Sequence, residues 1–146
     1  MAVVVFWINF FLFKKLITTT KSLISISFSL FILSFILIQG SIFWCILIKR
    51  ISKPGFAAKY TGKIYNKLKI LDVILLCMGV LVIILNYSTF FTMVLSFTIW
   101  IFAVIEWVNY YKLQLSYSLN PVVLLKYILQ RKLRKSKIAN EIDKSI

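Results

Sequence analysis

The sequence predicts an all-α integral membrane protein, a helical bundle of three to four transmembrane helices with basic amphipathic surface helices. Residues 22–48 form an uninterrupted run of 27 residues without a charge. Hydrophobic residues make up 61% of the chain, and its mean hydropathy is +0.93. The 18 lysines and arginines outnumber the 4 acidic residues and flank the apolar runs. A soluble domain has no reason to carry this composition, whereas a multi-pass membrane protein does.

The composition also excludes several classes of function. A formal charge of +14 would suggest nucleic-acid binding in a soluble protein, but basic residues beside apolar spans indicate orientation in the membrane and contact with anionic lipid headgroups. The chain contains no histidine, which excludes histidine metal ligands and Ser-His-Asp triads. We therefore expect no nucleic acid, no cofactor and no metal. Cys45 and Cys77 lie in apolar runs and are expected to be small buried hydrophobes without a disulfide.

The first apolar segment, residues 1–13, ends at Lys14 and Lys15. A helix of this length reaches roughly 20 Å, less than the ~30 Å hydrocarbon core of a bilayer. Three alternatives remain open, namely an interfacial helix, a short span and a re-entrant piece. Trp7 and Asn9 slightly favour the interface.

The second segment, residues 22–48, is the clearest predicted span, since a helix of this length reaches roughly 40 Å. Gln39, Gly40 and Ser41 form a polar notch in it, where Gly40 would let another backbone approach closely. Trp44 lies one turn before the basic end, where an interfacial anchor belongs.

Residues 49–69 carry seven basic residues and no acid, which predicts a cytoplasmic loop. Phe56, Tyr60, Ile64 and Leu68 recur every four residues, as in a basic amphipathic helix on the membrane surface. Together with the tail, this loop supplies the expected lipid-headgroup contacts, which are Lys53, Lys59, Lys63, Lys67, Arg131, Lys132, Arg134 and Lys135.

Residues 70–87 and 90–111 are the next predicted spans, and the polar turn at residues 86–89 makes them an antiparallel hairpin. The tail, residues 112–146, carries eight basic residues and is predicted to be cytoplasmic like the central loop. Asn120 and Pro121 would open a second basic surface helix, and residues 139–146 are expected to fray.

Only two acids, Asp72 and Glu106, lie within the apolar segments, and both are predicted near the cytoplasmic interface. Asn109 and Tyr110 follow Glu106 at helical spacing and share its face. The predicted polar cluster consists of Asp72, Glu106, Asn109, Tyr110, Lys49 and Arg50. Three interpretations remain open for it, namely an electrostatic clasp between spans, a site for an ion, proton or headgroup, and a catalytic site.

Two stretches carry a family resemblance. QGSIFWCILIKR (residues 39–50) places Gln-Gly before a Trp and a basic span end, and FAVIEWVNYYKLQLSY (residues 102–117) has a Glu-aromatic-x-Asn-Tyr run closing the last span. Together they resemble small multi-pass membrane proteins of low-GC Gram-positive bacteria that are generally described as uncharacterised. The resemblance covers about a third of the chain and implies a helical membrane fold without supplying an activity.

These observations predict a multi-pass protein of the cell membrane that is not an enzyme and acts as an accessory or immunity-type factor. Its partners would be membrane lipids and either another membrane protein or further copies of itself. The alternative is an oligomeric, holin-like pore former or a small transporter. A third hypothesis is a membrane enzyme that uses Asp72 and Glu106.

Overall fold

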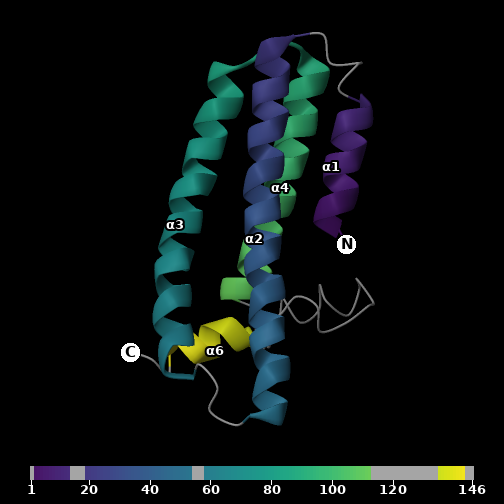
Figure 1. The fold of residues 1–146 in the computed structure, drawn as a ribbon. Helices are drawn as coiled ribbons and strands as arrows, with labels where there is room; N and C mark the ends of the chain where they lie inside the picture. The colour runs from purple at the N-terminus through teal and green to yellow at the C-terminus, as the bar shows by residue number, and fades with distance from the viewer. Residues whose placement is uncertain (1, 14–18, 54–57, 113–134, 144–146) are drawn as a thin grey trace, which may run out of the picture.

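The structure is a computed structural model that describes residues 2–13, 19–53, 58–112 and 135–143. These residues form five helices and no strand, so the predicted all-α fold is confirmed (Figure 1). The helices are α1 (Ala2–Phe13), α2 (Thr20–Ser52), α3 (Ala58–Leu85), α4 (Phe90–Tyr111) and α6 (Lys137–Asp143).

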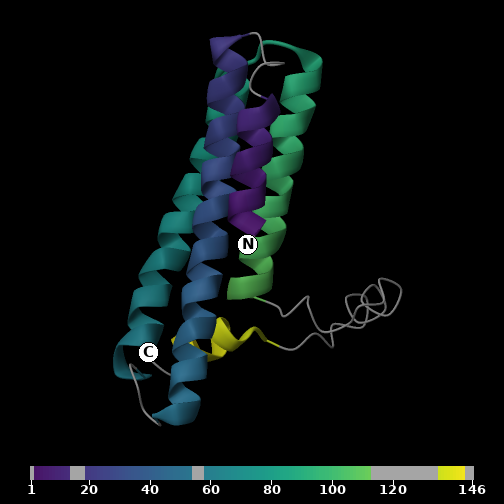
Figure 2. The same cartoon turned by 45° about the vertical axis from the view of Figure 1, so that its right-hand side comes forward.

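Three of these helices, α2, α3 and α4, are long and apolar enough to cross a membrane. Their 33, 28 and 22 residues correspond to roughly 50, 42 and 33 Å, against a hydrocarbon core of ~30 Å. They run side by side in both ribbon views (Figures 1 and 2). The chain is thus a membrane protein with three candidate spans in a helical bundle.

The core between the spans is narrow. Its buried side chains are Ile32, Leu33, Ile36, Leu76 and Ala103. The outward faces of the same helices carry exposed apolar side chains, such as Ile74, Leu81 and Phe102. In a bilayer these side chains meet lipid tails, which are as apolar as the core, so little of each span needs to be buried in protein.

The segment at residues 1–13 forms α1, which is not one of the candidate spans. It lies alongside the bundle rather than across its end and stops about half-way down (Figures 1 and 2). Trp7 Nε1 donates a hydrogen bond to Ser34 Oγ of α2 at 3.0 Å. The choice between an interfacial helix, a short span and a re-entrant piece stays a prediction.

The predicted surface helix before the third segment is instead the first part of α3, which runs without a break from Ala58 to Leu85. Its buried face carries Thr61, Tyr65 and Asp72, while Tyr60 and Ile64 are exposed. Of the apolar four-residue repeat, Tyr60 and Ile64 therefore face outward, whereas Leu68 packs against the buried cluster around Tyr65.

The tail departs from the expectation of fraying, because residues 139–143 belong to α6. Ile138 and Ile142, one turn apart, are buried against Phe43, Tyr65 and Tyr111. Since α4 ends at Tyr111 while α2 and α3 continue, α6 occupies the space beyond the end of α4 (Figure 1). The predicted surface helix after Asn120 lies outside the described residues.

The two cysteines also depart from the expectation of burial in protein. Cys45 and Cys77 are free thiols, and both are exposed on the outside of the bundle. Both belong to apolar runs in candidate spans, so in a bilayer these outward positions meet lipid.

Gly40 provides the close approach that the sequence predicts, but to a side chain rather than to a backbone. The ring of Tyr110 from α4 packs directly on it. A Cβ at position 40 would lie 2.7 Å from Tyr110 Cε2 and from its hydroxyl oxygen, and closer still to Cζ.

We expect Gly40→Ala to destabilise the bundle by about 1–3 kcal/mol, because the Tyr110 ring must move out of its packed position. Unfolding by detergent titration measures this free energy. The control is Ser41→Ala at the neighbouring exposed position, which should change it by less than about 0.5 kcal/mol. Equal stability of Gly40→Ala and wild type would contradict the packing of Tyr110 on Gly40.

Candidate functional site

Four side chains from the three candidate spans meet in a polar network, defined as Gln39, Tyr65, Asp72 and Tyr111. Gln39 Nε2 donates to Asp72 Oδ1 at 2.8 Å, and the Tyr111 hydroxyl donates to Gln39 Oε1 at 2.5 Å. The Tyr65 hydroxyl donates to the main-chain oxygen of Gln39 at 2.8 Å. Gln39 therefore joins α2 to both α3 and α4.

An amide suits this central position because it donates and accepts at the same time. Within a membrane span, the groups that it bonds have no water as an alternative partner, so each hydrogen bond between helices contributes about 0.6–2 kcal/mol. Asp72 is 0% exposed, and Gln39 is 5% exposed. The polar network is thus buried within the bundle.

One atom of the polar network lacks a partner. Asp72 Oδ2 is buried and accepts no hydrogen bond. A buried polar atom without a partner is destabilising by roughly 1–3 kcal/mol. Asp72 therefore ties α3 to α2 through one oxygen and leaves the other unused.

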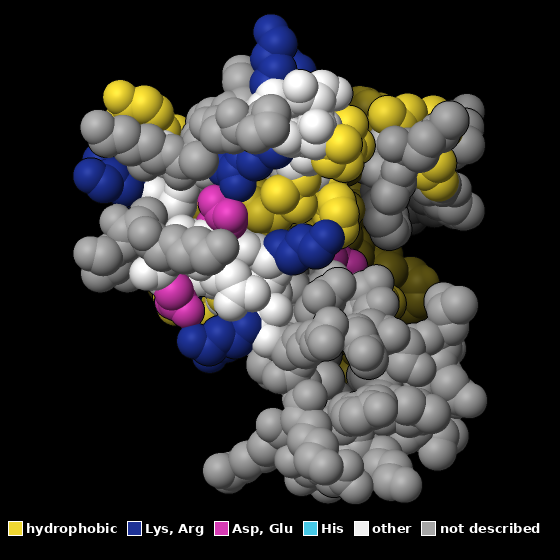
Figure 3. Space-filling model, turned by 90° about the horizontal axis from the view of Figure 1, so that it is seen from below, with side chains coloured by type: hydrophobic (Ala, Val, Ile, Leu, Met, Phe, Trp, Pro, Cys, Tyr) yellow, Lys and Arg dark blue, Asp and Glu magenta, His cyan; other side chains and the backbone are white. Residues whose placement is uncertain are grey.

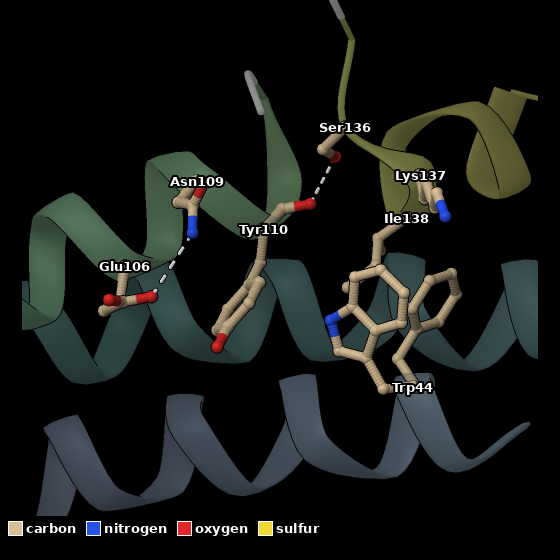
Figure 4. Close-up of a pocket in the computed structure, with 8 residues that line it drawn as sticks. Trp44, Glu106, Asn109, Tyr110, Ser136, Lys137 and Ile138 are labelled. Carbon is tan, nitrogen blue, oxygen red and sulfur yellow. Dashed lines mark hydrogen bonds between the residues drawn. The ribbon is translucent and has the colours of Figure 1, made fainter. Parts of the chain in front are cut away.

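The structure separates the predicted polar cluster into three parts, of which Asp72 is one. Glu106, Asn109 and Tyr110 share a face of α4, as predicted, but this face looks into a different cavity (Figure 4). Asn109 Nδ2 donates to Glu106 Oε2 at 3.5 Å, which is a long hydrogen bond. Glu106 therefore does not join the polar network.

This cavity, which we call the Glu106 cavity, has a volume of about 250 Å³. It lies between α2, α4 and the segment that begins α6. Its lining residues are Phe43, Trp44, Glu106, Asn109, Tyr110, Ser136, Lys137 and Ile138. Ser136 Oγ donates to the main-chain oxygen of Tyr110, which fixes the start of α6 against the end of α4.

Lys49 and Arg50 form the third part of the predicted cluster, at the end of α2. Arg50 Nη1 pairs with Glu141 of α6 at 2.9 Å, and its Nη2 donates to Thr61 Oγ1 of α3 at 3.0 Å. Arg50 thus links α2, α3 and α6. Lys49 is exposed beside it.

The predicted headgroup lysines gather at the end of the bundle where α2 ends and α3 begins, which we call the basic end (Figure 3). Lys53, Lys63 and Lys67 are exposed there, and exposed Lys135 pairs with Asp143 at 2.9 Å. Lys59 lies in α3, but its side chain lies outside what the structure describes. Arg131, Lys132 and Arg134 lie outside the described residues altogether.

Gln39, Tyr65, Tyr111 and Glu141 belong to these sites but are absent from the predicted cluster. Gln39 is predicted only as part of the polar notch in the second segment. Tyr65 precedes Asp72 by seven residues, a helical spacing that places both on one face, so this position could have been found. Tyr111 directly follows Tyr110, and nothing local in the sequence distinguishes the two. Glu141 lies in the segment that was expected to fray, and no sequence signal pairs it with Arg50.

No family model, curated protein or solved structure matches the chain. The family resemblance of residues 39–50 and 102–117 therefore stays a prediction. Within the described ranges, no group of three potential metal-ligating side chains comes together. The features of the described residues that bear on function are the polar network, the Glu106 cavity and the outer faces of the helices.

We expect Asp72→Ala to destabilise the protein by about 1–3 kcal/mol, since Gln39 Nε2 would be left buried without an acceptor. Asp72→Asn keeps an oxygen for Gln39 and should lose less. A double-mutant cycle of Asp72→Ala with Gln39→Ala should give a coupling of about 1 kcal/mol in detergent unfolding. Additive effects would contradict the hydrogen bond between the two side chains.

We expect Glu141→Gln to accelerate amide hydrogen exchange in residues 137–143 roughly tenfold, because it removes a charged partner from Arg50. The pair is largely shielded, with side chains 16% and 20% exposed. The control is Asp143→Asn, which breaks a pair whose side chains are 67% and 55% exposed and should change exchange by less than about twofold. The same rates in all three proteins would show that Arg50 does not hold α6.

Proposed function

We propose that this chain is a non-enzymatic accessory or immunity-type factor of the cell membrane, which acts by binding another membrane protein. The observation that supports this most is the closure of the polar network around Asp72, which is 0% exposed. A carboxyl group that no substrate or ion can reach serves to hold helices together. The bundle is then a rigid scaffold whose outer surface is available for contacts.

The outer faces of the candidate spans support the same proposal. Met78, Leu81 and Phe102 are among many exposed apolar side chains on α3 and α4. The exposed hydroxyls of Ser41 and Thr98 donate to main-chain oxygens of their own helices. Such faces suit lipid or the apolar surface of another membrane protein better than a water-filled channel.

We further propose that the basic end faces the cytoplasm. Lys49, Arg50, Lys53, Lys63 and Lys67 lie there. An excess of lysine and arginine marks cytoplasmic ends of membrane spans, and anionic headgroups attract them. The turn between α3 and α4 would then face the outside.

The alternative is a holin-like pore former or small transporter, and one observation favours it. Asp72 Oδ2 has no hydrogen-bond partner and could therefore bind a proton or an ion. In this alternative, α6 would have to leave its position against Tyr65 and Tyr111 to open a path to Asp72.

A photo-crosslinking amino acid at Met78, which is 47% exposed, should join the chain to a different membrane protein in cells of the source organism. The control is the same amino acid at Ile83 on the same helix, which is 1% exposed and should give no such product. Induction of the wild-type chain should leave the membrane potential, followed with a voltage-sensitive dye, unchanged. Depolarisation together with products that contain only this chain would contradict the proposal and support the pore former.

A further inference from the structure

The Glu106 cavity contains two opposite charges that do not neutralise each other. Glu106 and Lys137 both line it, yet they form no ion pair. Among the described residues, no lysine or arginine pairs with Glu106, and its contact with Asn109 is long at 3.5 Å. Lys137 Nζ lies 4.6 Å from the centre of the Trp44 ring, which attracts the cation without neutralising it.

The two charges lie at opposite ends of the cavity. Figure 4 shows Glu106 and Asn109 on one side of the Tyr110 side chain and Lys137 on the other. Trp44 and Ile138 lie at the Lys137 side, and Phe43 also lines the cavity. A ligand that fits this arrangement carries a cationic group and an anionic group on one short, partly apolar molecule.

The depth of the cavity restricts the ligand further. Glu106 precedes the last residue of α4, Tyr111, by five residues, or about 7 Å. Since the 22 residues of α4 span roughly 33 Å, Glu106 lies close to the level at which the ~30 Å hydrocarbon core gives way to headgroups. Lipid headgroups therefore lie within reach of this cavity.

We propose that the Glu106 cavity binds the headgroup of a zwitterionic aminophospholipid. The Glu106 carboxylate takes the ammonium group, and Lys137, held on the Trp44 ring, takes the phosphate. An anionic headgroup without an amine would leave Glu106 facing a like charge, and a bare cation would meet Lys137. This site lies apart from the polar network and does not depend on the proposed accessory role.

The test uses the full chain in nanodiscs with equal amounts of phosphatidylethanolamine and phosphatidylglycerol, followed by native mass spectrometry of the lipids that stay bound. Wild type should retain more phosphatidylethanolamine than phosphatidylglycerol. Glu106→Gln keeps the size of the side chain and should lower this ratio about tenfold, the value of one charge-assisted hydrogen bond. Lys137→Gln should reduce retained phosphatidylethanolamine, whereas Asp143→Asn, which removes an acid outside the cavity, should change nothing.

Three results would overturn the proposal. These are an unchanged lipid ratio in Glu106→Gln, a wild-type preference for phosphatidylglycerol, and full displacement of the lipid by soluble glycerophosphoethanolamine, which would assign the site to a water-soluble ligand. Circular dichroism checks that each variant keeps its helices. If Glu106→Gln loses them, the comparison of Lys137→Gln with Lys21→Gln, an exposed lysine at the start of α2 and outside the cavity, decides the question.

Discussion

The hydrogen bond between Gln39 and Asp72 is the interaction on which the rest of this bundle depends. Gln39 and Asp72 are buried between the helices and must find partners within the protein, because a buried polar group without a hydrogen bond is destabilising. Gln39 Nε2 meets Asp72 Oδ1 at 2.8 Å, and Tyr111 and Tyr65 complete the remaining bonds of Gln39. These hydrogen bonds fix the positions of α2, α3 and α4 relative to one another along their axes. The apolar contacts elsewhere in the bundle would allow the helices to shift along one another.

The three long helices end at different levels, and the contact between Tyr111 and Gln39 marks the level at which α4 ends. Since α4 ends where Tyr111 reaches Gln39, the longer α2 and α3 would leave an open space beyond it. The short helix α6 closes this space with Ile138 and Ile142, and Arg50 holds it through Glu141. The docking of α6 has two consequences. It seals the polar network from the basic end, and it brings Lys137 beside Trp44, which completes the Glu106 cavity.

The sequence predicts the spans well and the polar sites only in part. Long apolar runs determine the three candidate spans almost by length alone, and the spacing of Glu106, Asn109 and Tyr110 predicts their shared face. The pairing of Gln39 with Asp72, 33 residues apart, depends on how the helices rotate about their axes, which weakly amphipathic spans do not reveal. Because the sequence does not show this rotation, it predicts Asp72 and Glu106 in one cluster, whereas Asp72 lies in the polar network and Glu106 lines a separate cavity. The position of α6 depends on long-range contacts to Phe43 and Arg50 that no local pattern encodes.

The central claim is that Gln39 and Asp72 meet in a water-free contact between α2 and α3. Solid-state NMR of the protein in lipid bilayers tests it directly, with ¹⁵N in the Gln39 side chain and ¹³C in the Asp72 carboxyl group. The structure predicts a measurable dipolar coupling between the two labels, since the nitrogen lies 2.8 Å from Oδ1, which is bonded to the labelled carbon, together with no rapid magnetisation transfer from water to the carboxyl carbon. An absent coupling, or rapid transfer from water, would contradict the sealed polar network.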